Sequence, residues 1–253
     1  MAPNLRPPMA DPDVARQLVQ STDFVWHQRF ELATGVFTPG VSDVQFLYEV
    51  SGVPEDLTGK SVLDIGTTNG AAVFEAERRG ASRCVAVDIY PPTAFGFTAL
   101  AESVGSSAEF VRSSVYDLPV RLDGEQFDVV FFWGVLYHLR HPLLALDAVR
   151  SVARDRVYVE SAVSDSELPP RARKRSVSLF YRRDGLGNDG SNWFSPTTRL
   201  LKQWLGSCGL EPVSIHGWPE EAPRRAGGEC RITAPEWAEM SYEYPVGVRV
   251  ELP

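Results

Sequence analysis

Short apolar runs alternate with amphipathic stretches between residues 61 and 163 of the chain. The apolar runs have the length of strands, and their nearly continuous hydrophobicity is typical of a parallel sheet that is covered on both faces. The predicted strands are 61–65, 83–89, 108–114, 127–133 and 156–163. Apolar residues at helical spacing predict helices at 71–79, 97–104 and 142–153. Strands that alternate with helices predict an α/β fold with helices on both faces of the sheet.

Two segments fall outside this alternation. A leader before the first strand holds an aromatic run at 24–30 and predicted helices at 13–20 and 43–50, and a long polar insertion follows the fifth strand. Such a long loop is usually functional or mobile, so both segments either close over a site as lids or simply pack on the domain. The expected parts are a flexible or helical segment 1–23, a leader 24–58, and a core 59–253 with the insertion 164–194.

The pattern becomes regular again near residue 195. Ser195 and Pro196 predict the cap and first turn of a helix that ends at Gly209. A strand is predicted at 212–218. The last strand is either 229–233 or 246–252, and the second range is favoured.

The turn after the first predicted strand is the strongest candidate for a ligand site. It contains Gly66 and Gly70 and opens directly into a helix, where glycines let a ligand approach the backbone and the helix offers unpaired N–H groups. Asp88 ends the second strand 18 positions after Gly70, where a carboxylate can accept hydrogen bonds from both hydroxyls of a ribose. The ligand is therefore expected to contain an adenosine-like ribose.

Two cofactors compete for this turn, a dinucleotide and S-adenosylmethionine. A dinucleotide site requires a central glycine where this chain has Thr67 and Thr68, and the Asp64 carboxylate would repel a pyrophosphate. The pattern Asp64-x-Gly66 followed by Asn69-Gly70 instead resembles the first motif of class I methyltransferases. A buried turn without any ligand is the remaining alternative.

Composition narrows the class of partner. The chain has 253 residues and a formal net charge of −8, which disfavours non-specific binding to nucleic acid because phosphates are held mainly by lysine and arginine. The exception is a basic segment in the insertion, which is either a solvated loop or a substrate-binding element: Arg171, Arg173, Lys174, Arg175, Arg182 and Arg183. The three cysteines lack metal-site spacing, and no run has the length of a signal peptide or a membrane span. We expect a cytoplasmic protein without a metal site.

Further motifs carry a specific resemblance. They are Trp26-His27, Gly35-Val36-x-Thr38-Pro39-Gly40, Gly134-Val135-Leu136-Tyr137-His138 with Pro142, Asn192-Trp193-Phe194-x-Pro196, and Trp204-Leu205-x-x-Cys208-Gly209. With these motifs, residues 24 to 215 resemble the branch of class I methyltransferases that includes the bacterial tRNA wobble-uridine carboxymethyltransferases. The resemblance implies a Rossmann-like sheet that is mostly parallel, with seven strands of which the last is antiparallel, and S-adenosyl-L-methionine or a relative of it as donor.

The resemblance also implies where such a donor binds. Its ribose is expected at Asp88 with Ile89, its adenine at the turn after the third strand, and its methionine end near Gly66 and Trp133. The expected donor-binding residues are Asp64, Gly66, Thr67, Asn69, Gly70, Asp88, Ile89, Ser114, Val115, Tyr116 and Trp133. In the tRNA enzymes a lysine, a tyrosine and an arginine hold an extra carboxylate on the donor. Tyr137 matches the tyrosine, Arg182 or Arg183 is a candidate for the arginine, and no lysine occurs between residues 1 and 58.

Tyr137, His138 and His27 are the candidate catalytic residues. A histidine just after the fourth strand can take a proton from an attacking hydroxyl or amine near neutral pH. The alternative is that Tyr137 and His138 only shape the pocket. His27 in the leader is a rival base, His141 is a weaker candidate, and His216 on a late strand is expected to be structural.

Three functions follow from these patterns. The first is S-adenosylmethionine-dependent methylation of an oxygen or nitrogen of a small molecule, for example in a biosynthetic pathway. The second is modification of tRNA, which the acidic balance of the chain disfavours without excluding it. The third is a non-catalytic module that binds an adenosine ligand. The sequence does not predict an oligomeric state.

Overall fold

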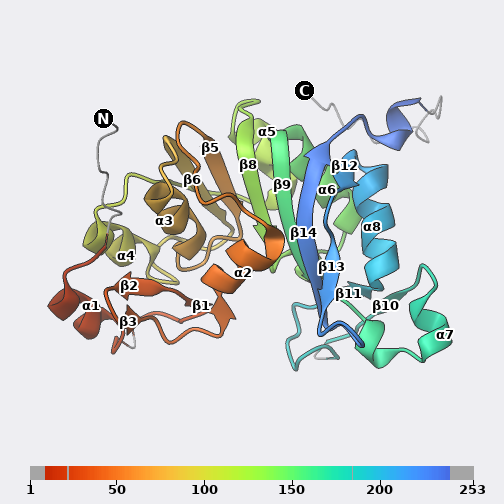
Figure 1. The fold of residues 1–253 in the computed structure, drawn as a ribbon, viewed down its shortest axis with the longest axis horizontal. Coiled ribbons are helices and arrows are strands. Elements are labelled where there is room, and N and C mark those ends of the chain that lie inside the picture. Colours follow the sequence, from red (N-terminus) through yellow and green to blue (C-terminus); the bar gives the residue numbers. More distant parts are fainter. Residues whose placement is uncertain (1–8, 22, 184, 240–253) are drawn as a thin grey trace. The chain divides into compact units, whose positions relative to one another are not determined.

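The computed structural model of the chain describes residues 9–21, 23–183 and 185–239. The chain forms two compact units (Figure 1). The first unit holds the leader and most of the parallel strands, up to Ser114, together with residues 127–131. The second unit holds residues 115–126 and the described chain from Phe132 onward.

The leader of the first unit consists of short elements. It begins with α1 (Pro12–Leu18) and continues through β1 (Gln28–Arg29), β2 (Glu31–Ala33), β3 (Val36–Phe37), β4 (Ser42–Asp43) and α2 (Val44–Ser51). β1 pairs in parallel with β4, and β2 pairs in antiparallel fashion with β3. The α1 and α2 helices lie close to their predicted ranges, whereas the four short strands were not predicted because each has only two or three residues.

The rest of the first unit is a parallel sheet with its crossover helices. Along the chain it contains β5 (Ser61–Ile65), α3 (Ala71–Arg78), β6 (Arg83–Asp88), α4 (Phe97–Val104), β7 (Glu109–Arg112) and the first residues of β8 (Phe127–Trp133). β5 pairs in parallel with both β6 and β8, and β6 pairs in parallel with β7. The apolar residues of β5 are buried, as the hydrophobic run predicts.

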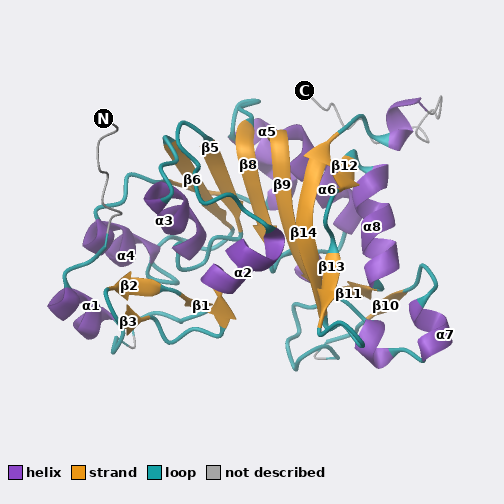
Figure 2. Ribbon diagram, viewed as in Figure 1, coloured by secondary structure: helices purple, strands orange, loops and turns teal. Residues whose placement is uncertain are grey.

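The second unit combines helices with antiparallel strands (Figure 2). Its elements are the 3-10 turn η1 (Val115–Asp117), α5 (Leu118–Arg121), the 3-10 turn η2 (Leu136–His138), α6 (Pro142–Ser151), β9 (Ala153–Ala162), the 3-10 turn η3 (Asp165–Glu167), α7 (Pro170–Arg173), β10 (Ser178–Phe180), β11 (Phe194–Pro196), α8 (Thr198–Ser207), β12 (Leu210–Pro212), β13 (His216–Trp218), β14 (Arg225–Ile232) and the 3-10 turn η4 (Glu236–Glu239). β14 pairs in antiparallel fashion with β9, β12 and β13, and β10 forms an antiparallel pair with β11.

The main sheet has the strand order β12, β14, β9, β8, β5, β6, β7, with β13 paired to β14. This confirms the predicted α/β class and the mostly parallel sheet with an antiparallel strand late in the chain. The part of the chain that the structure describes contains no helix that is long and apolar enough to cross a membrane.

Of three predictions for the end of the chain, two are wrong and one lies outside the described residues. Ser195 and Pro196 are part of β11, and the α8 helix is capped by Thr197, whose side chain accepts a hydrogen bond from the N–H of Leu200. The single strand predicted at 212–218 is wrong, because β12 and β13 are two short strands with a break between them. The favoured last strand, 246–252, lies outside the described residues, and β14 includes residues 229–232 of the alternative strand at 229–233.

Candidate active site

The turn between β5 and α3 is tied to the end of β6. The N–H groups of Gly66 and Thr67 both donate to the carbonyl of Val87, at 2.8 and 3.0 Å, and the N–H of Gly70 donates to the carbonyl of Thr67 at 2.9 Å. Thr68 has a φ of +46°, which is uncommon for a β-branched residue and indicates local backbone strain. The predicted cradle residues therefore form one compact turn.

Gly70 is required by the packing of this turn. It has a φ of +90°, and a Cβ atom at this position would lie 2.7 Å from ring atoms of both Phe74 and Phe97. The predicted role of Gly70 was close approach of a ligand to the backbone. Within the first unit, the structure instead shows close approach of two aromatic rings.

Asp88 is nearly buried and is oriented by two backbone groups. Its Oδ2 accepts from the N–H of Thr68 and its Oδ1 accepts from the N–H of Tyr90, both at 3.0 Å. A carboxylate has about four acceptor positions, so about two remain beyond these bonds. That number matches the two hydroxyls of a ribose. Ile89, the next residue, exposes 57% of its surface.

Asp64 is buried in the strand below the turn, and its Oδ2 has no hydrogen-bond partner among the described residues. Burial raises the pKa of the Asp64 carboxyl to about 7; the nearby Thr67 side chain opposes this effect, and the Asp88 carboxylate adds to it. The Thr68 hydroxyl is likewise buried without a described partner. Buried polar atoms are rarely left without hydrogen bonds, so these two atoms fit a ligand that carries donors and acceptors, such as the methionine end of the donor.

Asn69 holds the leader against this turn. Its Oδ1 accepts from the N–H groups of His27 and Gln28, both at 2.9 Å, and its Nδ2 donates to the carbonyls of Val25 at 3.0 Å and Phe95 at 2.7 Å. The side chain is fully buried. All four bonds go to backbone groups, so Asn69 organises the turn rather than offering its amide to a ligand.

Gln28 is a residue of this site that the sequence pattern did not reveal. Its Oε1 accepts from the N–H of Ala71 at 2.9 Å, at the start of α3. Gly70 is the N-cap of that helix and has no side chain, so the leader supplies the cap. The sequence shows that Gly70 has no capping side chain, but it does not show that Gln28, 42 positions earlier, provides one. His27 itself is exposed, and its ring contacts Phe95 at a centroid distance of 5.1 Å.

In the second unit, Tyr137 lies beside an ion pair in which Glu160 is buried and Arg225 is half-buried. The Arg225 guanidinium is 4.9 Å from the centroid of the Tyr137 ring and makes two parallel hydrogen bonds with the carboxylate of Glu160. Burial raises the pKa of the Tyr137 hydroxyl, and Arg225 opposes that effect. The arginine that meets Tyr137 is therefore Arg225. Arg182 and Arg183, the predicted candidates, are exposed.

His138 follows Tyr137 in the η2 turn and is half-buried. Its ring lies 4.2 Å from the Tyr137 ring, and its Nδ1 is 2.9 Å from the hydroxyl of Ser191. His141 is exposed, and its N–H donates to the Tyr116 hydroxyl at 3.1 Å. His216 is also exposed, and its Nδ1 lies 2.7 Å from the carbonyl of Ser214. Of these three histidines, His138 is the one that is half-buried and has a ring nitrogen within hydrogen-bond distance of a side-chain hydroxyl.

The structure thus gathers the predicted residues into separate groups. Asp64, Asp88 and the turn 66–70 come together in the first unit, with His27 beside them, and Tyr137 meets His138 in the second. Ser114 is half-buried at the end of its segment in the first unit. Val115 is buried and Tyr116 half-buried in η1, while Trp133 is buried at the end of β8.

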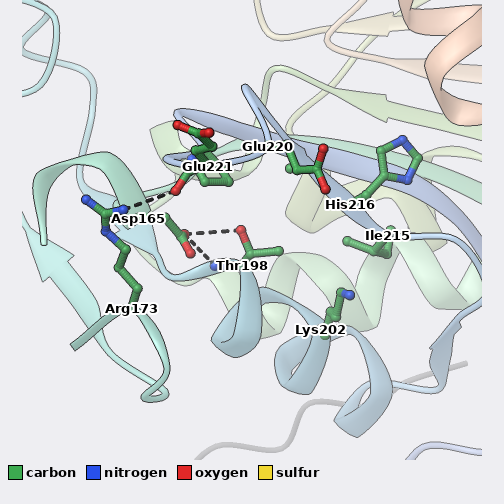
Figure 3. A pocket seen from close by; sticks show the side chains of 10 residues that line it. Asp165, Arg173, Thr198, Lys202, Ile215, His216, Glu220 and Glu221 are labelled. Carbon is green, nitrogen blue, oxygen red and sulfur yellow. Dashed lines mark hydrogen bonds between the residues drawn. The ribbon is translucent and has the colours of Figure 1, made fainter. Parts of the chain in front are cut away.

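A pocket of about 500 Å³ in the second unit contains none of the predicted site residues. Thr198 and Lys202 of α8 line it together with His216 (Figure 3). Asp165 lies at its wall and accepts from the N–H of Thr198 at 2.7 Å. Arg173, from the basic segment, donates to the backbone carbonyl of Glu221 at 3.1 Å, so this arginine has a structural partner. Among the residues that the structure describes, no cluster of three or more histidine, cysteine or acidic side chains is placed to hold a metal ion.

The family model described as "Methyltransferase domain" matches residues 25–215. The chain belongs to this methyltransferase domain family. The match covers all of the motifs quoted from the sequence, from Trp26 to Gly209.

The relatives of this methyltransferase domain protein include enzymes that act on tRNA. It is 28% identical over 163 residues to the tRNA U34 carboxymethyltransferase of Aeromonas salmonicida (strain A449), a match that spans 63% of this chain and 47% of that protein. It is 31% identical over 166 residues to the enzyme of the same name from Campylobacter hominis, spanning 63% and 53% of the two chains. The chain thus spans about half the length of the curated relatives it matches.

Solved structures share its fold. The 1,6-didemethyltoxoflavin-N1-methyltransferase of Burkholderia thailandensis, with 1,6-didemethyltoxoflavin and S-adenosylhomocysteine bound, matches with a TM-score of 0.53 and 22% identity over 75% of this chain and 76% of that one. The N-terminal domain of EvdMO1, solved in the presence of S-adenosylhomocysteine and D-fucose, matches with a TM-score of 0.60 and 16% identity over 89% and 98% of the two chains. The predicted family is confirmed, and with it the Rossmann-like fold.

Proposed function

We propose that this methyltransferase transfers the methyl group of S-adenosylmethionine to an oxygen or nitrogen of a small molecule in a biosynthetic pathway. The observation that carries the choice of acceptor is an aromatic surface on the β10–β11 hairpin. Phe180 exposes 53% of its surface, and its ring lies 6.2 Å from that of Trp193 and 5.3 Å from that of Phe194. Aromatic surface with few polar groups is typical of small-molecule sites.

Asp88 is the proposed ribose ligand, because its two remaining acceptor positions suit a vicinal diol. Asp64 and Thr68 are proposed to face the methionine end of the donor, where their unpartnered oxygens would find partners. The remaining predicted donor-binding residues stay in the proposal, with Asn69 and Gly70 acting through the shape of the turn.

When bound, the donor supplies an electrophilic methyl group on a sulfonium. The protein's contribution is then to position the acceptor, exclude water and remove a proton where the acceptor carries one. His138 is the proposed base, since it is half-buried and its ring is fixed by Tyr137 and Ser191. His27 is exposed in the leader and stays the second candidate.

The proposed donor is the plain methyl form. Tyr137 corresponds to the tyrosine that holds an extra donor carboxylate in the tRNA enzymes, but the charge of the Arg225 guanidinium beside it is already balanced by the buried Glu160. An additional carboxylate would therefore meet a neutral pair instead of an unbalanced cation.

Donor binding and transfer can be tested separately. Calorimetry with S-adenosylmethionine should show micromolar binding by the wild type and at least tenfold weaker binding by Asp88→Ala, since a hydrogen bond to a charged group contributes on the order of 1.5–3 kcal/mol. Asp56→Asn, at an exposed position, is the matched control. Equal donor affinity in Asp88→Ala and the wild type would show the ribose assignment to be wrong.

Transfer is then measured with isotope-labelled donor and a panel of aromatic alcohols and amines. Incorporation of label into one of them supports the proposal. Donor binding without transfer to any small molecule or RNA supports the non-catalytic alternative.

Modification of tRNA is the second candidate function. Two observations favour it, namely the curated relatives and the exposed basic side chains of the insertion. The exposed members of the segment are Arg171, Lys174, Arg175, Arg182 and Arg183. The same insertion carries the aromatic hairpin. A small-molecule acceptor would contact the aromatic hairpin, whereas tRNA would contact the basic side chains.

A further inference from the structure

A chain of hydrogen bonds leads from His138 to a carboxylate in the insertion. The Ser191 hydroxyl donates to Oδ1 of Asp189 at 2.7 Å, and the Nδ1 atom of His138 lies 2.9 Å from the same hydroxyl oxygen. The backbone N–H of Ser191 also donates to Oδ1 of Asp189, at 2.8 Å. The hydroxyl is therefore held in one position between the carboxylate and the imidazole.

These hydrogen bonds determine which ring nitrogen of His138 carries a proton. A carboxylate can only accept hydrogen bonds, and the Ser191 hydroxyl donates its single proton to Oδ1 of Asp189. The hydroxyl oxygen must then accept from His138, which places a proton on Nδ1. In the neutral ring, the lone pair that can take up a proton is consequently on Nε2.

The segment that carries Ser191 is fastened to the turn that carries His138. The N–H of Trp193 donates to the carbonyl of Tyr137 at 2.8 Å, and the side chain of Asn192 donates to the carbonyl of Leu186 at 2.8 Å. Arg140 lies 4.2 Å above the ring of Trp193. These contacts hold the serine within reach of the imidazole.

We propose that Ser191 and Asp189 are positioning residues that hold His138 in its Nδ1–H form, so that Nε2 takes the proton of the methyl acceptor. The inference rests on the proposed function, in which His138 is the base. As the bond from the acceptor oxygen or nitrogen to the methyl carbon forms, the bond from that carbon to sulfur breaks and its electron pair stays on sulfur. The acceptor proton moves to Nε2, and the Asp189 carboxylate stabilises the resulting imidazolium through Ser191.

The proton position can be measured without knowing the acceptor. Long-range proton–nitrogen NMR spectra distinguish the two neutral forms of a histidine ring, and this chain has only four histidines, so His138→Gln assigns the signals. The wild type at neutral to mildly basic pH should show His138 mainly as the Nδ1–H form. Ser191→Ala should lose that preference, so that the Nε2–H form becomes the main species.

Three further variants separate this role from a structural one. Ser191→Thr keeps the hydroxyl and should keep the Nδ1–H form. Asp189→Asn keeps an acceptor for both Ser191 groups and should also keep it, whereas Asp189→Ala frees the hydroxyl proton for the ring and should lose it. If the wild type is mainly Nε2–H, or if Ser191→Ala leaves the ring unchanged, the proposal is overturned.

Calorimetry with S-adenosylhomocysteine on the same samples separates this inference from the proposed function. We expect all five proteins, wild type and the four Ser191 and Asp189 variants, to bind it within about twofold of one another. A wild type that shows the Nδ1–H form but binds neither donor nor product would overturn the catalytic role and the proposed function together. Binding in all five proteins with an unchanged ring in Ser191→Ala would overturn the inference alone.

Discussion

The side-chain oxygen of Asn69 accepts a hydrogen bond from the backbone N–H of His27 at 2.9 Å, although the two residues are 42 positions apart. The amide nitrogen of the same side chain reaches the carbonyl of Phe95 in the segment after β6. One buried amide therefore joins the leader, the turn after β5 and the segment that follows Asp88. This arrangement makes the predicted donor-binding turn dependent on the leader.

Asn69→Ala should lower the free energy of unfolding by about 2–4 kcal/mol, because it leaves buried backbone N–H and carbonyl groups without partners. Chemical denaturation measures this change. Asn69→Asp is the matched control, since it keeps both acceptor bonds but loses the two donor bonds to Val25 and Phe95. A loss below about 0.5 kcal/mol in Asn69→Ala would contradict the organising role, because surface substitutions have effects of that size.

The pKa of Asp64 leads to a prediction about stability and pH. The folded protein holds this carboxyl with a pKa of about 7, compared with an ordinary value of 3.8, so folding favours the protonated form. Its stabilising contribution is fully present below about pH 4 and is lost as the pH rises to about 7. Asp64→Asn has no such group. Its free energy of unfolding should therefore increase relative to that of the wild type as the pH rises from about 4 to about 7, by up to about 4 kcal/mol at roughly 1.4 kcal/mol per pKa unit.

Asp56→Asn is a control of opposite sign. Hydrogen bonds from Thr58 lower the pKa of the exposed Asp56 carboxyl, so its contribution is present at higher pH and is lost as the pH falls through the lowered pKa. Denaturation of the three proteins at several pH values measures both trends. A constant difference between Asp64→Asn and the wild type from pH 4 to pH 7 would rule out the raised pKa.

The sequence predicted the strands and helices whose pattern is local. The ranges of β8 and α4 agree with the prediction at both ends, because one is a continuous apolar run and the other a stretch with clear helical spacing. The start of α8 was misplaced, since Ser195 and Thr197 are both acceptable caps and only pairing of β11 with β10 decides between them.

The partners of the candidate site residues were less accessible from sequence. Arg225 meets Tyr137 because antiparallel pairing of β14 with β9 places Arg225 opposite Ala162, two positions from Glu160. No local spacing encodes that register. Gln28 and Ser191 likewise act through tertiary contacts, on α3 and on His138 respectively.

The ion pair between Glu160 and Arg225 should control which donor is preferred. We expect the wild type to bind S-adenosylmethionine more tightly than its carboxylated form. Glu160→Gln leaves the guanidinium charge beside Tyr137 without its counterion, so the relative affinity for the carboxylated donor should rise on the order of tenfold, given about 1.5–3 kcal/mol for a hydrogen bond to a charged group.

Arg225→Met is the matched control, since it removes the cation and should not raise the affinity for the carboxylated donor. Competition calorimetry with both donors measures the ratio. Thermal unfolding checks that each variant folds, because each substitution breaks an ion pair that has a buried carboxylate. Tighter binding of the carboxylated donor by the wild type would overturn the choice of the plain methyl donor.

The choice between a small molecule and tRNA depends on the basic segment of the insertion. Exposed arginines such as Arg182 and Arg183 are the side chains that would contact phosphates, but the whole chain carries a net charge of −8. We therefore expect filter binding to show at most weak association with bulk tRNA. The double variant Arg182→Glu with Arg183→Glu should change it little, and should leave donor affinity unchanged. Sub-micromolar binding that falls steeply with salt, and that the double variant abolishes, would overturn the small-molecule assignment and favour tRNA, because the salt slope reports the number of phosphate contacts.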